Sequence, residues 1–176
     1  GTRVIIDAME GNVNNMELLL SCFRELLDNP EIDPALKAAS LVLPSFQDLK
    51  GDLVSAGKIP IDPDSILNAR ENVRLEIAQK LKGSLWQQYK LSRERCKTYE
   101  FSPEQVANRR LAHVCLRYLT HLIGQDSHAD EEIVSTCKHL FQTADNMTDQ
   151  MAALDCLSHL DVIEREQALE SFYGQW

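Results

Sequence analysis

Three polar residues near the end of the chain have side chains of types that can do chemistry. Asn146, Thr148 and Asp149 place an amide, a hydroxyl and a carboxylate within four positions, and a small, apolar run follows them. The same residues are typical of a helix start, because Asn146 or Thr148 can accept a first-turn N–H and Asp149 meets the positive end of the helix dipole. We therefore interpret the triplet as the start of a helix near Met147, and not as a site.

The histidines do not form the motif of a zinc peptidase. They are His113, His121, His128, His139 and His159, and none begins the pattern of two histidines four residues apart with Glu after the first. Two Cys–His pairs could each supply two zinc ligands. These pairs are Cys137 with His139 and Cys156 with His159. Both cysteines fall within the apolar stripe of their own helix, so we expect no metal ligand and no cofactor in this chain.

Motifs for nucleophilic catalysis and phosphate binding are also missing. The chain has no Gly-x-Ser-x-Gly elbow and no Gly-rich phosphate loop. The acidic pair Glu131–Glu132 is typical of a solvated helix start, and the short basic run Asn108–Arg110 is interpreted as surface or as a contact for a partner. We therefore predict no catalytic and no cofactor-binding residue.

The composition indicates an acidic, folded domain. Of the 176 residues 44% are hydrophobic, and 27 acidic against 18 basic residues give a formal net charge of −9. The negative charge argues against nucleic acid and against an anionic membrane surface as partners, because both are bound by clustered Lys and Arg. The sequence contains no apolar run long enough for a membrane span, and its start lacks the features of a signal peptide.

The cysteines indicate reduced thiols. They are Cys22, Cys96, Cys115, Cys137 and Cys156, an odd number without a paired short spacing. All except Cys96 fall within apolar helical patterns. We predict free, mostly buried thiols, as in a protein of a reducing compartment such as the cytoplasm.

Most of the chain has the periodicity of amphipathic helices. Apolar residues recur every three or four positions within 16–28, about 65–91, 103–124, 130–144, 147–160 and 162–176. In the long helix of about 65–91 the predicted buried positions are Ile66, Ala69, Val73, Ile77, Leu81 and Leu85. In the last segment they are Leu169, Phe172, Tyr173 and Trp176. Because this pattern reaches Trp176 without a cap, we expect the helical structure to continue beyond it.

Helix starts and loops can be placed from caps and breakers. Asp33 before Pro34 predicts one start, and Ser45 with Asp48 three residues later predicts another. A third is predicted at Ser102, with Pro103 in the first turn and Gln105 completing a capping box. Segment 55–64 contains Gly57, Pro60 and Pro63 and is the clearest loop.

Together these elements predict an all-α fold. The only β-branched run, Val4–Ile6, is too short to indicate a strand. Helices of similar length with short joins favour antiparallel pairs stacked side by side, as in an irregular superhelix of the HEAT or armadillo type. We predict that residues 1–176 form a single helical segment.

Four motifs occur in order between residues 20 and 176. They are FRELLDNPEIDPALKAASLVLPSFQDL at 23–49, RRLAHVCLRYL at 109–119, NMTD with AAL at 146–154, and AL, FY and W at 168–176. In this order they resemble the C-terminal helical domain of the bacterial aminopeptidase N family. Members of this family, also called alanyl aminopeptidases, are zinc metallopeptidases of the gluzincin clan.

The resemblance implies a role without chemistry of its own. Family members carry an HExxH zinc motif, a distant Glu ligand and a GAMEN segment in a separate catalytic domain, and this chain contains none of them. It also lacks the family's Asn-Pro-Asn-Arg segment. The implied function is that of a non-catalytic part of an enzyme that removes N-terminal amino acids from peptides, helping to enclose its active-site cavity.

The implied partners are the catalytic and other domains of the same polypeptide, and peptide substrates in the whole enzyme. Zinc would be held by the catalytic domain, and the implied location is cytoplasmic. The alternative is a stand-alone α-solenoid scaffold that binds proteins through its concave face.

Overall fold

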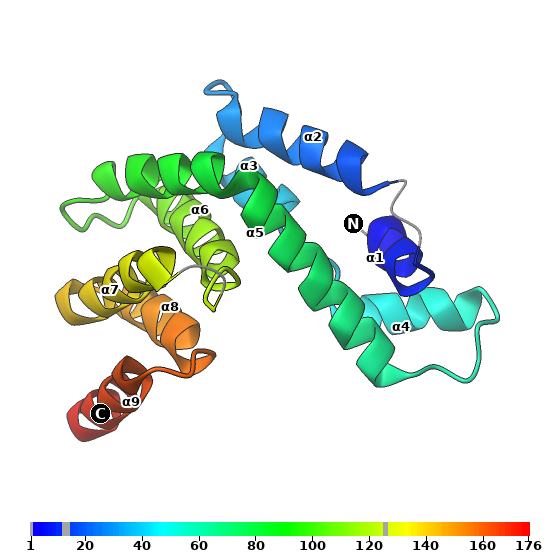
Figure 1. Cartoon of the computed structure of the whole chain (residues 1–176). Coiled ribbons are helices and arrows are strands. Elements are labelled where there is room, and N and C mark those ends of the chain that lie inside the picture. Colours follow the sequence, from blue (N-terminus) through cyan, green and yellow to red (C-terminus); the bar gives the residue numbers. More distant parts are fainter. Residues whose placement is uncertain (1, 12–14, 125–126) are drawn as a thin grey trace.

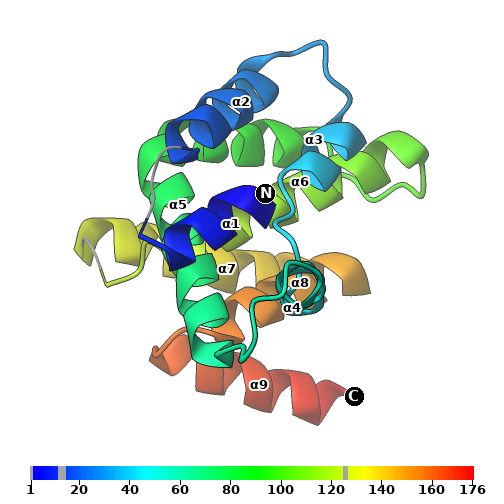
Figure 2. The ribbon, with the colours of Figure 1, turned by 90° about the vertical axis from the view of Figure 1, so that its right-hand side faces the viewer.

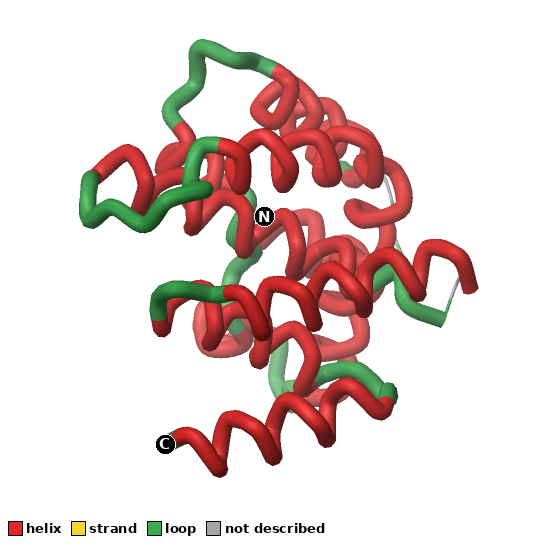
Figure 3. Tube along the Cα trace, turned by 90° about the vertical axis from the view of Figure 1, so that its left-hand side faces the viewer, coloured by secondary structure: helices red, strands yellow, loops and turns green. Residues whose placement is uncertain are grey.

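The computed structural model describes residues 2–11, 15–124 and 127–176, and all regular structure in these ranges is helical (Figure 3). In chain order the helices are α1 Thr2–Met9, α2 Met16–Asp28, α3 Pro34–Ser40, α4 Phe46–Ser55, α5 Pro63–Glu94, α6 Pro103–Thr120, α7 Ser127–Thr143, α8 Met147–Ser158 and α9 Ile163–Gln175. The predicted all-α class is confirmed. Of the helices in the described ranges, none combines the length and the apolar character that crossing a bilayer requires.

Helix α5 lies at the centre of the fold. It packs against α6 and also against α1, α2 and α4. All six of its predicted apolar positions are buried. Figure 1 shows that α5 changes direction part-way along its length. Its sequence contains the pair Gly83–Ser84, a kind of pair at which helices bend. Because of the bend, one helix contacts both the first helices of the chain and the later pairs.

The later helices form a stack. Helices α5 and α6 pack against each other, α7 packs against α8, and α6 also contacts α8. Helix α9 packs on α8 and α7 at one end of the stack, and α2 lies at the other end (Figure 2). The buried side chains form one continuous core from Val4 to Ala168. This arrangement is the predicted irregular superhelix of helix pairs.

Two of the predicted helix starts are confirmed by their caps. The Asp33 carboxylate accepts backbone N–H groups of the first turn of α3, from Ala35 at 2.8 Å and from Leu36 at 3.2 Å. At α4, Ser45 and Asp48 form a capping box in which each side chain accepts the backbone N–H of the other. These bonds satisfy N–H groups that have no partner within the helix.

The start of α6 is correct, but its predicted capping box is wrong. The Ser102 hydroxyl accepts the Gln105 N–H at 3.3 Å, as a cap should. The Gln105 side-chain oxygen, however, accepts the backbone N–H of Glu100 at 2.9 Å instead of that of Ser102. Its amide also donates to the Thr98 carbonyl at 2.8 Å. Gln105 therefore fastens the α5–α6 loop onto the helix start, which helix periodicity alone does not reveal.

The end of α2 is joined to two other helices by buried polar side chains. The Leu27 carbonyl accepts Lys37 Nζ of α3 at 2.9 Å and Gln88 Nε2 of α5 at 2.7 Å. Burial, with a smaller contribution from Arg95, lowers the pKa of Lys37. These bonds satisfy a carbonyl at a helix end that has no intrahelical donor.

The burial predicted for the last segment is wrong. The exposed fractions of Leu169, Tyr173 and Trp176 are 44%, 88% and 71%, and Phe172 is only half-buried. Ala168 is the residue of α9 that is buried. Within the described residues α9 packs mainly on α8 and α7, so only one side of it is covered. Periodicity shows which residues share a face, but not whether another element covers that face.

A short helix, α1, also forms at the start of the chain, where no helix was predicted. Val4–Ile6, the run considered too short to judge, lies within α1. Val4 and Ile5 are buried against the core, and α1 packs on α5 and α4. Helix α1 is too short for its period to be recognised, and its stability comes from tertiary packing.

Candidate functional site

Asn146 begins α8, as one of the two predicted caps. Its backbone is extended, with φ −148° and ψ 150°, and its side-chain oxygen accepts the Asp149 N–H at 2.9 Å. The helix starts at Met147, and Asp149 lies in its first turn. The interpretation of the triplet as a helix start is confirmed, and the cap is Asn146 rather than Thr148.

Asp149 itself is buried and is held by three side chains. Its Oδ2 accepts a hydrogen bond from Arg93 Nη1 at 2.6 Å, and its Oδ1 lies 2.6 Å from His113 Nε2. The Asn146 amide also donates to Oδ2, at 3.1 Å. Because Arg93 belongs to α5 and His113 to α6, the carboxylate joins these helices to α8. We call Arg93, His113, Asn146 and Asp149 the Asp149 junction.

The surroundings of Asp149 keep its carboxylate charged. Burial by itself raises the pKa, because it removes water from the charged form. Hydrogen bonds from His113 and Arg93, together with their positive charges, outweigh burial and hold the pKa of Asp149 well below its usual range. The group is therefore ionised at physiological pH, where it cannot act as a general acid.

The arrangement of the junction is that of a structural contact. Both carboxylate oxygens are engaged, and within the described residues the His113 ring is hydrogen-bonded only to Asp149. A histidine that activates a nucleophile needs a hydroxyl or thiol within hydrogen-bond reach. Arg93 and His113 lie 56 and 36 positions from Asp149 in the sequence. No local pattern could have indicated them as its partners.

The two Cys–His pairs do not converge on one point. Cys137 and Cys156 are both buried, and the Cys156 thiol, together with burial, raises the pKa of Cys137. His139 and His159 are exposed and line different hollows of the surface. The described residues contain no group of three or more His, Cys, Asp or Glu able to hold a metal ion. The side chain of His128 lies outside the described residues.

The cysteines are free, and most are buried. Cys96, Cys115, Cys137 and Cys156 are buried, whereas Cys22 is exposed. The predicted burial of Cys22 is wrong, because Cys22 lies on the outer face of α2, away from the contact with α5. Burial raises the pKa of Cys115 to about 12, so this side chain is a neutral thiol at physiological pH.

The basic run at 108–110 does not form a basic surface. Asn108 and Arg109 are buried, with exposed fractions of 1% and 5%, and only Arg110 is exposed. Arg109 donates to the Gln105 side chain at 2.8 Å, and its guanidinium lies over the ring of Tyr99. The prediction of a surface or partner contact is therefore wrong for two of the three residues. Glu131 and Glu132, by contrast, are exposed as predicted.

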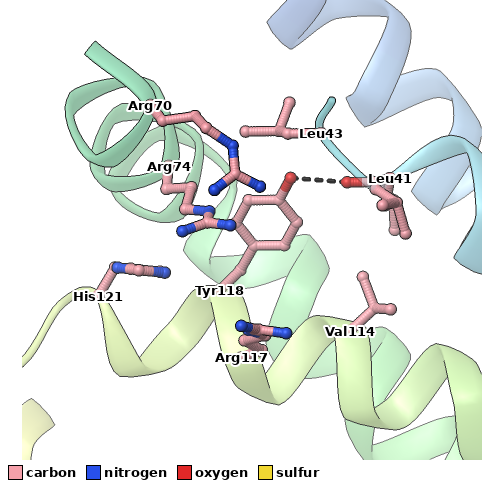
Figure 4. A pocket seen from close by; sticks show the side chains of 9 residues that line it. Leu41, Leu43, Arg70, Arg74, Val114, Arg117, Tyr118 and His121 are labelled. Atoms are coloured by element: carbon pink, nitrogen blue, oxygen red, sulfur yellow. Dashed lines mark hydrogen bonds between the residues drawn. The ribbon is translucent and has the colours of Figure 1, made fainter. Parts of the chain in front are cut away.

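His121 lies at a hollow of a different kind. Together with Arg70, Arg74 and Arg117 it lines a hollow of about 260 Å³ between α5, α6 and the link from α3 to α4 (Figure 4). No local sequence pattern groups these arginines. They come from two helices, and their grouping appears only when α5 packs on α6.

Comparison with known proteins agrees with the fold. A family model described as "Domain of unknown function (DUF3458_C) ARM repeats" matches residues 1–176. The chain belongs to this family of ARM-repeat domains. Its membership and its helix pairs together confirm the predicted armadillo-like architecture.

Two curated relatives of this ARM-repeat chain share a name. Aminopeptidase N of Escherichia coli (strain K12) is 30% identical over 154 residues, which cover 88% of this chain and 16% of that protein. Aminopeptidase N of Haemophilus influenzae (strain ATCC 51907 / DSM 11121 / KW20 / Rd) is 27% identical over 158 residues, which cover 90% of this chain and 16% of that protein. The resemblance to the C-terminal helical domain of aminopeptidase N is confirmed. The chain spans about one sixth of the length of these relatives.

Proposed function

We propose that this chain serves as a non-catalytic part of the C-terminal helical domain of a zinc-dependent aminopeptidase and helps to enclose its active-site cavity. The observation that carries the proposal is the match of nearly the whole chain to a small part of two proteins named Aminopeptidase N. The other domains of the same polypeptide are the proposed partners, and peptides are the proposed substrates of the whole enzyme. The proposed location is the cytoplasm.

The chemistry of the described residues supports a non-catalytic role. Zinc-dependent peptide hydrolysis needs protein ligands, an activated water and a general base. The chain has no HExxH motif, and Asp149, the buried carboxylate that contacts a histidine among the described residues, is fully engaged in the Asp149 junction. Zinc and the base therefore belong to another domain in this proposal.

The absence of catalysis can be tested on the isolated chain. Alanine p-nitroanilide would be incubated with the purified 176-residue chain and added zinc, and release of p-nitroaniline followed by absorbance. We expect no turnover above the buffer rate. Robust turnover that a chelator abolishes would contradict the proposal.

Enclosure of the active site can be tested in the whole aminopeptidase. Hydrolysis of alanine p-nitroanilide would be compared with removal of the N-terminal residue from a long peptide, with and without the segment equivalent to residues 1–176. We expect loss of the segment to raise the rate on the long peptide relative to that on the small amide. Turnover of the small amide reports that the catalytic domain is still folded. An unchanged ratio of the two rates would contradict enclosure.

A further inference from the structure

Three arginines line the hollow at which His121 lies. Arg70 and Arg74 come from α5, and Arg117 comes from α6. Figure 4 shows the guanidinium groups of Arg70 and Arg74 beside each other, next to the ring of Tyr118. We call this hollow the arginine pocket. Three permanent positive charges are thus gathered at one place on a chain whose net charge is −9.

The Arg70 side chain is fixed in place without an acidic partner. Its Nε donates to the Pro44 carbonyl at 2.7 Å, which holds the guanidinium at the wall of the pocket. No ion pair of Arg70 occurs among the described residues. Burial, followed by the charge of Arg74, lowers the pKa of Arg70. A guanidinium that has lost water and faces a like charge is stabilised by an added anion.

The other two arginines have acidic partners that lie outside the pocket. Arg74 pairs with Glu71, and Arg117 lies 3.8 Å from Asp155. Both carboxylates are about half exposed, and both line the neighbouring hollow instead. The Arg117–Asp155 pair is exposed on both sides and is therefore weak, because water and salt screen it, whereas Arg74 is only 17% exposed. Within the arginine pocket itself, positive charge therefore remains in excess.

His121 does not add a fourth positive charge to the arginine pocket. Its Nδ1 lies 3.3 Å from Glu71 Oε2. Burial lowers the pKa of His121, and the charges of Arg74 and Arg117 lower it further against the opposing effect of Glu71. The ring is therefore neutral at physiological pH with its proton directed at Glu71, and it adds no charge to the pocket.

The remaining wall of the pocket is apolar. Leu41, Val42, Leu43 and Val114 also line the pocket, and Val42 is 58% exposed whereas Leu41 and Leu43 are buried. The Tyr118 hydroxyl is already used, because it donates to the Leu41 carbonyl at 2.7 Å. The pocket therefore presents guanidinium donors together with aliphatic groups.

We propose that the arginine pocket binds a carboxylate attached to a small aliphatic group, as at the C-terminal end of a short peptide that ends in leucine or valine. A guanidinium fork matches the two oxygens of a carboxylate. The aliphatic wall accommodates the attached side chain, whereas it gives a strongly hydrated phosphate no compensation for lost water. The site uses only residues of this chain and does not depend on the proposed role in an aminopeptidase.

The proposal can be tested by calorimetric titration of the 176-residue chain at low ionic strength. The probes are N-acetyl-L-leucine, its neutral amide N-acetyl-L-leucinamide, and inorganic phosphate. We expect N-acetyl-L-leucine to bind with a dissociation constant on the order of 1 mM, a typical affinity for a small ligand with few polar contacts. The amide should bind about tenfold more weakly, because it cannot form the charge-assisted pair.

Matched variants locate the site. Arg70→Gln and Arg117→Gln should each weaken binding of N-acetyl-L-leucine about tenfold. Arg110→Gln removes an exposed arginine of the same helix as Arg117, outside the pocket, and should leave binding unchanged. Arg117 is 57% exposed, so its variant should keep the fold even if Arg70→Gln, which loses the bond to Pro44, does not. Circular dichroism checks the helix content of each variant.

Each other outcome overturns part or all of the proposal. If phosphate binds as tightly as N-acetyl-L-leucine, the pocket recognises charge alone and the aliphatic part of the assignment is wrong. If the amide binds as well as the acid, if Arg117→Gln has no effect, or if no probe binds, the site does not exist as described. None of these results bears on the proposed domain role, which is tested separately by peptide hydrolysis.

Discussion

The Asp149 junction and the arginine pocket are both built by α5 and α6, but their charges are balanced in different ways. At the junction one buried carboxylate faces a guanidinium, an imidazole and an amide, all within 3.1 Å. At the pocket three guanidinium groups share one hollow, where Arg70 forms no ion pair among the described residues and the carboxylate partners of Arg74 and Arg117 lie outside the hollow. A buried carboxylate surrounded by donors from three helices holds those helices together, whereas guanidinium groups that outnumber the carboxylates in their hollow indicate a place for an anionic ligand.

The strongest test of this contrast removes the central carboxylate. Asp149→Ala leaves Arg93 and His113 without their partner in a mostly buried position, and we expect it to lower the free energy of unfolding by about 3 kcal/mol. Urea unfolding followed by circular dichroism measures the change. Asp155→Ala is the matched control, because this carboxylate is 47% exposed and lies 3.8 Å from Arg117. Asp155→Ala should lower the free energy of unfolding by less than about 0.5 kcal/mol. Equal losses in the two variants would contradict the difference between the junction and the pocket.

The second test uses pH. Because the folded-state pKa of Asp149 is depressed, its stabilising effect is present above the unfolded-state pKa of about 4 and is lost as the pH falls toward the folded value. Asp149→Asn lacks this titration. We expect the difference in unfolding free energy between wild type and Asp149→Asn to be constant near neutral pH and to shrink below about pH 4. A difference that stays constant in acid would show that the charge of Asp149 is not what stabilises the junction.

A smaller loss of stability is expected at Asn146, where two variants distinguish the helix cap from the contact with Asp149. Asn146→Ala removes both the oxygen that caps α8 and the amide that donates to Asp149, and we expect it to cost about 1 kcal/mol. Asn146→Ser keeps a capping oxygen but not the amide donor, so it should cost less. Thermal unfolding of the two variants measures the difference. If Ser is no better than Ala, the cap contributes little and the amide contact dominates.

The smallest change in the free energy of unfolding is expected for a substitution in the arginine pocket. Arg117→Gln should change the free energy of unfolding by less than about 0.5 kcal/mol. Any change should be a gain at low ionic strength, because one of three neighbouring positive charges is removed, and added salt should reduce that gain. Arg110→Gln serves as the control for the loss of one positive charge elsewhere on α6. A loss of more than 1 kcal/mol in Arg117→Gln alone would show that this arginine is structural, like Arg93 of the junction.

Local sequence patterns predicted the parts of this fold that depend on local physics. The bounds of α2, the caps at Asp33, Ser45 and Asn146, and the buried stripe of α5 follow from periodicity and from hydrogen bonds within a few residues. The superhelical stacking of these helices was predicted from their similar lengths and the short joins between them.

Features that depend on distant contacts could not be predicted in this way. Asp149 was expected to meet only its own helix dipole, and its partners Arg93 and His113 come from two other helices. Tyr173 shows the opposite case, because it shares a face with apolar neighbours in the sequence and yet is 88% exposed. The arginine pocket likewise exists only where two helices meet. Tertiary packing decides which polar residues are paired and which apolar faces are covered.

The central claim is that the charged residues around Asp149 hold helices together and do no chemistry. The most direct test introduces Asp149→Asn into the aminopeptidase of which we propose this chain forms part, and measures both Tm and kcat/KM on alanine p-nitroanilide. We predict a lower Tm with kcat/KM at 25 °C within about twofold of wild type, because a structural contact does not stabilise the transition state. An unchanged Tm with kcat/KM reduced about a hundredfold would contradict the account.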